Sequence, residues 1–172
     1  MLYADSKKYL LEKLKLAGLK TKPYTTLKAL EKSQESHIGA VLFESETILR
    51  NGSKTLFIDE MGARKKRRKV FDRGLAFTVT IGDYTDEAVE TMLETFLGQL
   101  DKGIYVNGNF VPLVVEGADW VDKDDSILKA QVAVQIKVRF DGGVYKDTDF
   151  AAVSEIVVES VTKDRKEPTD GS

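Results

Sequence analysis

A run of six consecutive basic residues is the part of this sequence with the clearest potential for chemistry. The run consists of Arg64, Lys65, Lys66, Arg67, Arg68 and Lys69. Without these six, the chain keeps 20 of its 26 basic residues against 28 acidic ones, which is a formal charge of -8. Such a run can neutralise nucleic-acid phosphates, bind an acidic protein surface such as one on a second copy, or form a solvated loop. Because no aromatic residues interleave with the run and the rest of the chain is acidic, a protein contact is favoured over nucleic acid.

The residues that usually carry catalysis or bind metals are scarce. The chain has no cysteine, which excludes thiolate metal sites, disulfides and cysteine nucleophiles. It has one histidine, His37, so no site within a single chain can use two histidines. We expect His37 to be a solvated or loop residue at the edge of the strand that begins at Ile38. No nucleophile or orienting group in the sequence marks it as catalytic.

Carboxylates cluster at residues 83–87, 119–125 and 141–149, but none of these clusters has the twelve-residue calcium-loop pattern. They are typical of turns and helix caps. Gly142-Gly143 lacks the lysine-serine pair and the following helix of a phosphate-binding loop, so it predicts a tight turn instead. The sequence therefore predicts no cofactor, no metal and no enzymatic activity.

Three helices are expected to position these residues. They run from Asp5 or Ser6 to Ala17, from Thr25 or Thr26 to Glu35, and from Thr85 to Leu100. The third has the strongest signals, because Thr85 can cap it, two acids occupy its first turn, and apolar residues recur at helical spacing. Its broad apolar stripe indicates a helix that covers a sheet.

Alternating and β-branched segments predict the strands. They are Ile38–Phe43, Glu46–Arg50, Thr55–Ile58, Phe71–Ile81, Ile104–Val106, Phe110–Glu116, Leu128–Phe140 and Glu155–Val161. Asn51-Gly52 and Asn107-Gly108-Asn109 each predict a hairpin, since asparagine and glycine accept the positive φ angles of tight turns. Residues 61–69 are interpreted as a mobile charged connection, and Asp141-Gly142-Gly143 as a turn.

The order of these elements predicts an α+β fold, with an antiparallel or mixed β-sheet and helices packed on one face. Residues 1–162 are expected to form a single domain, and residues 163–172 a disordered C-terminal tail. No segment has the length and hydrophobicity of a membrane span or a signal peptide, which predicts synthesis in the cytosol and no membrane partner.

The element order also resembles that of a known family. A strand leads through Gly82-Asp83-Tyr84-Thr85 into an amphipathic helix, the short hairpin 103–115 follows, and a long alternating strand ends on Arg139-Phe140-Asp141-Gly142-Gly143-Val144-Tyr145. Over residues 69–145 this pattern resembles the tail terminator (tail completion) proteins of tailed bacteriophages and phage-tail-like particles. The motifs are an element order and a strand ending, with no chemical signature.

The resemblance implies a tail-terminator-like α+β fold that forms a hexameric ring on the last layer of the tail tube. Such a ring, made in the bacterial host cytoplasm, would end tube polymerisation at the head-proximal end of the tail. Its partners would be copies of itself, the tube protein, and the sheath and head-connector proteins. It needs no catalytic residue.

The family supplies no residue-by-residue site, so the contact residues are proposed from their own chemistry. They are Arg64, Lys65, Lys66, Arg67, Arg68 and Lys69 as a contact loop, and Asp141, Gly142, Gly143, Val144 and Tyr145 as a turn near a subunit edge. The alternatives are another head–tail junction or baseplate component, a nucleic-acid-binding module that uses residues 64–69, and an unrecognised hydrolase or transferase.

Overall fold

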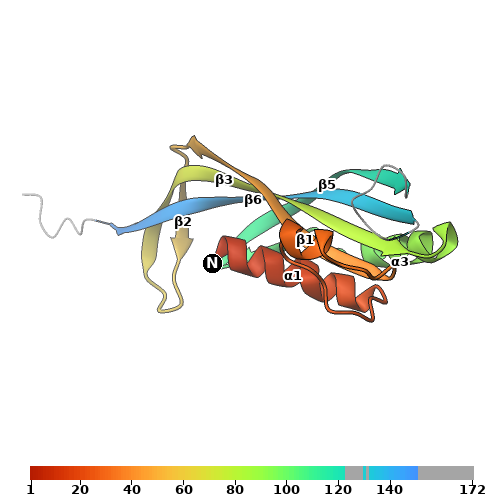
Figure 1. Cartoon of the computed structure of the whole chain (residues 1–172). Helices are drawn as coiled ribbons and strands as arrows, with labels where there is room; N and C mark the ends of the chain where they lie inside the picture. The colour runs from red at the N-terminus through yellow and green to blue at the C-terminus, as the bar shows by residue number, and fades with distance from the viewer. Residues whose placement is uncertain (123–129, 131, 151–172) are drawn as a thin grey trace, which may run out of the picture.

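A computed structural model of the protein describes residues 1–122, 130 and 132–150. The helices are α1 (Leu2–Leu16), α2 (Leu27–Glu31) and α3 (Asp86–Gly98). The strands are β1 (Ile38–Arg50), β2 (Lys54–Ile58), β3 (Arg64–Asp83), β4 (Gly103–Val106), β5 (Asn109–Asp122) and β6 (Val132–Asp149). They form one antiparallel sheet in the order β1-β3-β6-β5-β4, with β2 also paired to β3 (Figure 1). The predicted α+β fold class is confirmed.

The main core lies between the sheet and the two longer helices. Alternate residues of β3, from Leu75 through Phe77 to Ile81, point to this side and are fully buried. α3 contributes Val89, Met92 and Phe96, and its cap is the predicted one, because the Thr85 hydroxyl accepts a hydrogen bond from the Ala88 amide at 3.2 Å. The predicted role of this helix, covering the sheet, is confirmed.

A second, smaller core lies on the opposite face of the same sheet. Leu30 of α2 packs there with Ile38 and Ala40 of β1 and with Ala133 of β6. Successive residues of a strand face opposite sides of the sheet. Gly39 faces the side chains of α1 and of the loop that follows it, so its neighbours Ile38 and Ala40 must face the other side. The two longer helices therefore share one face, and α2 covers one end of the other. α2 is shorter than predicted and ends at Glu31.

The first helix begins earlier than the sequence predicted. Asp5 and Ser6 are not its caps, because the helix starts at Leu2 and Met1 occupies the cap position without a side-chain hydrogen bond. The reason is tertiary packing: Leu2 is buried against Gly142 of β6, which extends the helix toward the N-terminus. The predicted end is correct, and Gly18 takes a φ angle of 108° just beyond it.

The predicted hairpin at Asn51-Gly52 is wrong, whereas the one at Asn107-Gly108 is confirmed. β1 and β2 do not pair with each other; both pair with β3, one after the other along the same edge. The chain therefore continues in one direction through residues 51–53, beside the bulge between Lys69 and Phe71. The reversal occurs instead at residues 59–63, where Gly62 has a φ angle of 80° and the Asp59 carboxylate accepts hydrogen bonds from two turn amides.

The predicted turn at Asp141-Gly142-Gly143 is also wrong. β6 runs through it without interruption, because Asp141, Gly142 and Gly143 pair with Gly74, Arg73 and Asp72 of β3. Beyond the helices, β3 and β6 continue together with β2 as a three-stranded extension, formed by residues 54–58, 64–69 and 145–149. We call this extension the arm; in Figure 1 it projects to the left, away from the helix-covered body.

The predicted strand Glu155–Val161, the predicted tail 163–172 and most of the predicted turn at 122–125 lie outside the described residues. The single-domain assignment of residues 1–162 thus stays a prediction. Within the described part of the chain, no helix is long and apolar enough to span a membrane.

Candidate assembly surface

The basic run is part of a β-strand and not the loop that its composition predicted. Residues 64–69 form the first part of β3, where β2 pairs with residues 64–68 on one edge and β6 with residues 65–69 on the other. In a strand, successive side chains point to opposite faces. The run is therefore divided into two halves: Lys65, Arg67 and Lys69 are partly buried, and Arg64, Lys66 and Arg68 are exposed.

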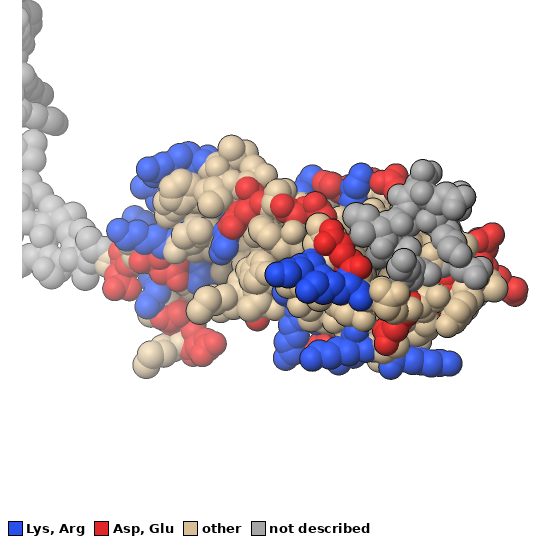
Figure 2. Space-filling view, viewed as in Figure 1, with Lys and Arg blue, Asp and Glu red and all other residues tan. Residues whose placement is uncertain are grey.

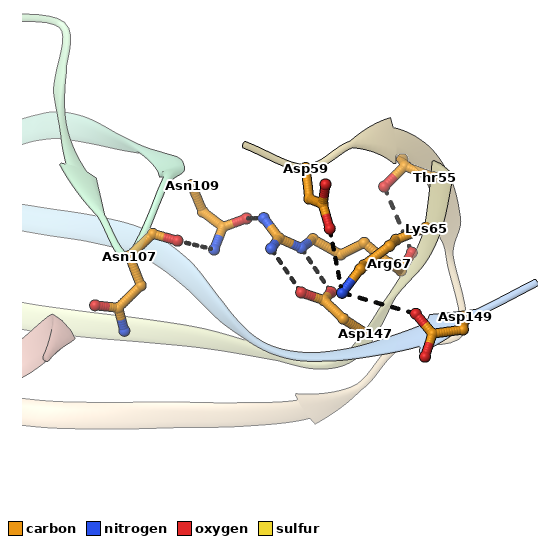
Figure 3. A network of polar contacts seen from close by, with 8 residues as sticks. All are labelled: Thr55, Asp59, Lys65, Arg67, Asn107, Asn109, Asp147 and Asp149. Carbon is orange, nitrogen blue, oxygen red and sulfur yellow. Dashed lines mark hydrogen bonds and ion pairs between the residues drawn. The ribbon is translucent and has the colours of Figure 1, made fainter. Parts of the chain in front are cut away.

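The partly buried half is paired with carboxylates, and Figure 3 shows the contacts of Lys65 and Arg67. Arg67 makes a bidentate contact with Asp147 of β6, at 2.8 and 2.7 Å, and donates to Asn109 Oδ1 at 2.9 Å. Lys65 lies 3.3 Å from Asp59 and 3.7 Å from Asp149, and Lys69 lies 2.6 Å from Asp72. Through Asn109, at the tip of the β4–β5 hairpin, these contacts connect the arm to the body. Three of the six cations of the run are therefore paired with carboxylates of the same chain.

These pairs shift the protonation of their members in the expected direction. The hydrogen bond from Arg67 lowers the pKa of Asp147, and the same contact raises the pKa of Arg67. The pKa of Asp72 is lowered by hydrogen bonds from Lys69 and Asn51. The Arg67 guanidinium also lies over the Phe57 ring, 4.3 Å from its centroid, so the paired side of the arm has a rigid polar and aromatic core.

Acid should loosen the arm before it loosens the body. Because the pKa values of Asp147 and Asp72 are lower in the folded protein than the ordinary 3.8, their stabilising effect is complete above that value and is lost as the pH falls below it through the folded values. We expect the protection of amides in residues 65–69 and 145–147 against hydrogen exchange to fall below about pH 4 while Val79 stays protected. Equal loss of protection in both regions would contradict this expectation.

The exposed half of the run lies on the opposite face of the arm and is joined there by cations of the adjacent strands. The pairing of β3 with β2 and β6 places five cations and two apolar residues on this face: Lys54, Arg64, Lys66, Arg68 and Lys146, with Leu56 and Ile58. We call these seven residues the cationic face. Among the described residues, none of its five cations forms an ion pair, and Leu56 and Ile58 are 71% and 66% exposed. In Figure 2, lysine and arginine side chains lie over the arm together with acidic ones.

The second predicted contact segment, Asp141 to Tyr145, lies beside the first as the neighbouring strand. Gly142 permits α1 to approach, since a Cβ atom there would lie 2.6 Å from Leu2 Cδ2. At Gly143 a Cβ atom would lie 3.0 Å from the Phe71 carbonyl oxygen. Val144 is 44% exposed, and Tyr145 lies under Arg67 and Lys69. The segment therefore positions α1 and supports the paired side of the arm.

The structure brings both predicted segments together, because Lys69 pairs with Tyr145 and Phe71 with Val144. Sequence reasoning missed the other members of the cationic face: Lys54, Leu56 and Ile58 of β2, and Lys146 of β6. The alternation of Lys54, Leu56 and Ile58 with Thr55 and Phe57 was a usable signal for a two-faced strand. Their place beside the basic run depended on a register that no local pattern specifies.

His37 has a structural role and is less solvated than predicted. Its Nδ1 lies 2.7 Å from the Asp83 carboxylate, and its Nε2 accepts a hydrogen bond from the Lys20 amide at 3.1 Å. These contacts attach the segment that follows α1 to the C-terminal end of β3. The described residues contain no group of three or more histidine, cysteine or acidic side chains placed to hold a metal ion.

Comparison with known proteins identifies the fold. No protein-family model matches the sequence, and no curated protein matches it. Among solved structures, the chain is similar to one from a cryo-EM structure of an extracellular contractile injection system, described as the PVC sheath/tube terminator in its extended state. The two share 12% sequence identity with a TM-score of 0.50, over 96% of this chain and 65% of the other. This chain has a sheath/tube terminator fold.

The tail-terminator-like fold predicted from the element order is thus confirmed. The similarity extends beyond residues 69–145, since it covers 96% of this chain. This chain spans about 65% of the length of the terminator chain that it matches. At 12% identity the match establishes the terminator fold alone.

Proposed function

We propose that this protein is a structural terminator that forms a ring at the end of the tail tube of a phage or phage-tail-like particle. The ring, hexameric by resemblance, ends polymerisation of the tube and sheath and joins the tail to the head or collar. The observation that carries the proposal is the similarity of fold to a sheath/tube terminator over 96% of the chain. The protein acts through its surfaces and catalyses no reaction.

The arrangement of the molecule supports this proposal. A terminator must bind its neighbours with one surface and the tube with another, because using the same surface for both would let polymerisation continue. This chain has a helix-covered body and a projecting arm with the cationic face, whose lysines and arginines form no ion pair with the described residues, so different surfaces are available for the two kinds of partner. The partners proposed are copies of this chain, the tube protein, the sheath protein and the head connector.

The test is the length of the tubes in cells that assemble the particle. Without this chain, tubes and sheaths are expected to be longer and more variable in electron micrographs, and the wild-type gene should restore a uniform length. A labelled chain should lie at the head-proximal end of the particle. An unchanged length distribution would contradict the proposal, and label at the opposite end would favour a baseplate component.

A further inference from the structure

We infer that the cationic face of one copy packs on the outer face of α3 of the next copy, so that subunits join head to tail. The inference deepens the proposed function and rests on its ring, for which it identifies the two complementary surfaces. The occupant of the cationic face is thus a second copy of this chain.

The outer face of α3 is acidic, and its carboxylates have no ion-pair partner among the residues that the structure describes. The acids Asp86, Glu87, Glu90 and Glu94 are all exposed, and the helix contains no lysine or arginine. Among the described residues, none of these four acids takes part in an ion pair. Helical spacing places them on one side, opposite the buried Val89, Met92 and Phe96. Within the described part of the chain, α3 therefore presents a strip of exposed carboxylates that form no ion pair.

The two surfaces match in apolar content as well as in charge. Leu97 and Tyr84, at the two ends of the acidic strip, are 40% and 60% exposed. On the arm, the exposed Leu56 and Ile58 lie among the cations. A phosphate backbone would leave these apolar side chains without a partner, whereas a helix with exposed leucine and tyrosine at its ends can cover them.

The lengths of the two surfaces are compatible. Arg64, Lys66 and Arg68 cover four residue steps of a strand, about 13 Å. Glu87 to Glu94 covers seven residues of a helix, about 10 Å. Each cation of the strand can therefore lie within reach of a carboxylate of the helix, given the length and flexibility of lysine and arginine side chains.

The two surfaces cannot meet within one chain, because they lie at opposite ends of the molecule. In Figure 1 the arm is at the left and α3 at the right, and Figure 2 shows acidic side chains at the right-hand end. A contact between two different surfaces of identical subunits is heterologous, and repetition of such a contact produces a closed ring or an open filament. The arrangement therefore provides the kind of contact that a ring requires.

Symmetric pairings are opposed by charge repulsion. Two arms packed through their cationic faces would place five unpaired cations against five more. Two copies of α3 packed through their outer faces would place four carboxylates against four. Like charges brought together across an interface are strongly unfavourable, so only the head-to-tail pairing is electrostatically complementary.

The absence of cysteine from the sequence permits a direct cross-linking test. A chain with both Lys66→Cys and Glu90→Cys is treated with a short bis-maleimide, both as purified protein and in assembled particles. We expect a ladder of covalent oligomers above the dimer, since each chain carries one reactive thiol on each of the two contacting surfaces. Each single variant should yield no ladder, because one thiol per chain cannot propagate a chain of cross-links.

A matched control combines Lys66→Cys with Glu12→Cys, which places the second thiol on an exposed position of α1. Loss of the ladder in this control is expected. Efficient dimers from Lys66→Cys alone would overturn the inference in favour of arm–arm pairing. No ladder together with DNA retention that Arg64→Ser, Lys66→Ser and Arg68→Ser abolish would overturn it in favour of nucleic acid.

Failure of this inference and failure of the proposed function give different results. If tube length depends on the chain but the double variant gives no ladder, the terminator role stands and the interface is wrong. If the ladder forms but tube length is independent of the chain, the interface stands and the terminator role is wrong.

Discussion

Reversing the charge of Lys66 and Arg68 to glutamate is expected to abolish self-association without unfolding the protein. Both side chains are exposed on the cationic face and form no ion pair with another described residue. Lys66 Nζ lies 4.5 Å from the centroid of the half-exposed Phe150 ring, so the folded chain loses this surface contact and is expected to keep its fold. Across the proposed interface, the change sets glutamates against the carboxylates of α3. Like-charge contacts of this kind cost several kcal/mol, so association should weaken by about 100-fold or more. Analytical ultracentrifugation measures association, and thermal unfolding tests the fold.

The matched control makes the same charge change on the other side of the same strand. Replacing Arg67 with glutamate removes its contacts with Asp147 and Asn109 and sets two carboxylates together. Thermal unfolding should then occur a few degrees lower, since the loss of about 1 kcal/mol shifts the midpoint by about 2–4 °C in a domain of this size. If the two variants changed association and the unfolding midpoint to the same extent, the division of the basic run into two halves would have no functional meaning.

A complementary mixture tests the head-to-tail geometry further. The variant with Lys66→Glu and Arg68→Glu has two acidic surfaces, and a second variant with Glu87→Lys, Glu90→Lys and Glu94→Lys has two basic ones. Neither should associate alone. Mixed in equal amounts, they should form alternating oligomers, because each acidic surface then meets a basic one. No recovery in the mixture would contradict the pairing of these surfaces.

Replacing Phe77 with alanine is expected to have the largest effect on folding. Phe77 is 1% exposed and its ring lies against those of Tyr3, Phe43 and Phe140, at centroid distances of 6.0, 5.6 and 6.1 Å. It thus joins α1 to three adjacent strands. Truncation of a buried phenylalanine costs about 3–5 kcal/mol, a large share of the 5–15 kcal/mol that stabilises a typical domain. The unfolding midpoint should fall by about 10 °C or more.

Phe43→Ala is the control for this prediction. Its ring packs on Phe77 and Tyr3, but 40% of the residue remains exposed, so its truncation removes less apolar surface from the core and leaves a smaller cavity. Its cost should be clearly smaller than that of Phe77→Ala. A Phe77→Ala protein with a wild-type midpoint would show that the aromatic cluster does not hold α1 on the sheet.

The body and the arm are stabilised by different interactions. The body buries apolar side chains between the sheet and the helices, whereas none of the described helices covers the arm, which relies on strand pairing and on the Arg67 and Lys65 contacts. Apolar burial is insensitive to pH, whereas exposed ion pairs are weakened by acid and screened by salt. The part of the chain proposed to contact a neighbour is therefore also the part most easily changed by solution conditions.

The sequence by itself determined the features that depend on neighbouring residues. The cap at Thr85 and the apolar stripe after it specify α3, Gly18 ends α1, and Asn107-Gly108 makes a hairpin turn with positive φ angles. The strand through Phe77 follows from its alternation. These features are local, since each depends on hydrogen bonds or packing within a few positions of the chain. The order of such elements was sufficient to predict a terminator-like fold.

Tertiary structure alone decided which strands pair and in what register. Asn51-Gly52 has the composition of a hairpin turn, but β3 is long enough to pair with β1 and β2 in succession, so no reversal is needed there. Six consecutive cations have the composition of a loop, yet they form a strand, in which Asp147 and Asp149 of the distant β6 and Asp59 of the adjoining turn neutralise one side. The opposite side of the strand keeps its positive charge. The two sides differ because successive side chains of a paired strand point to opposite faces of the sheet.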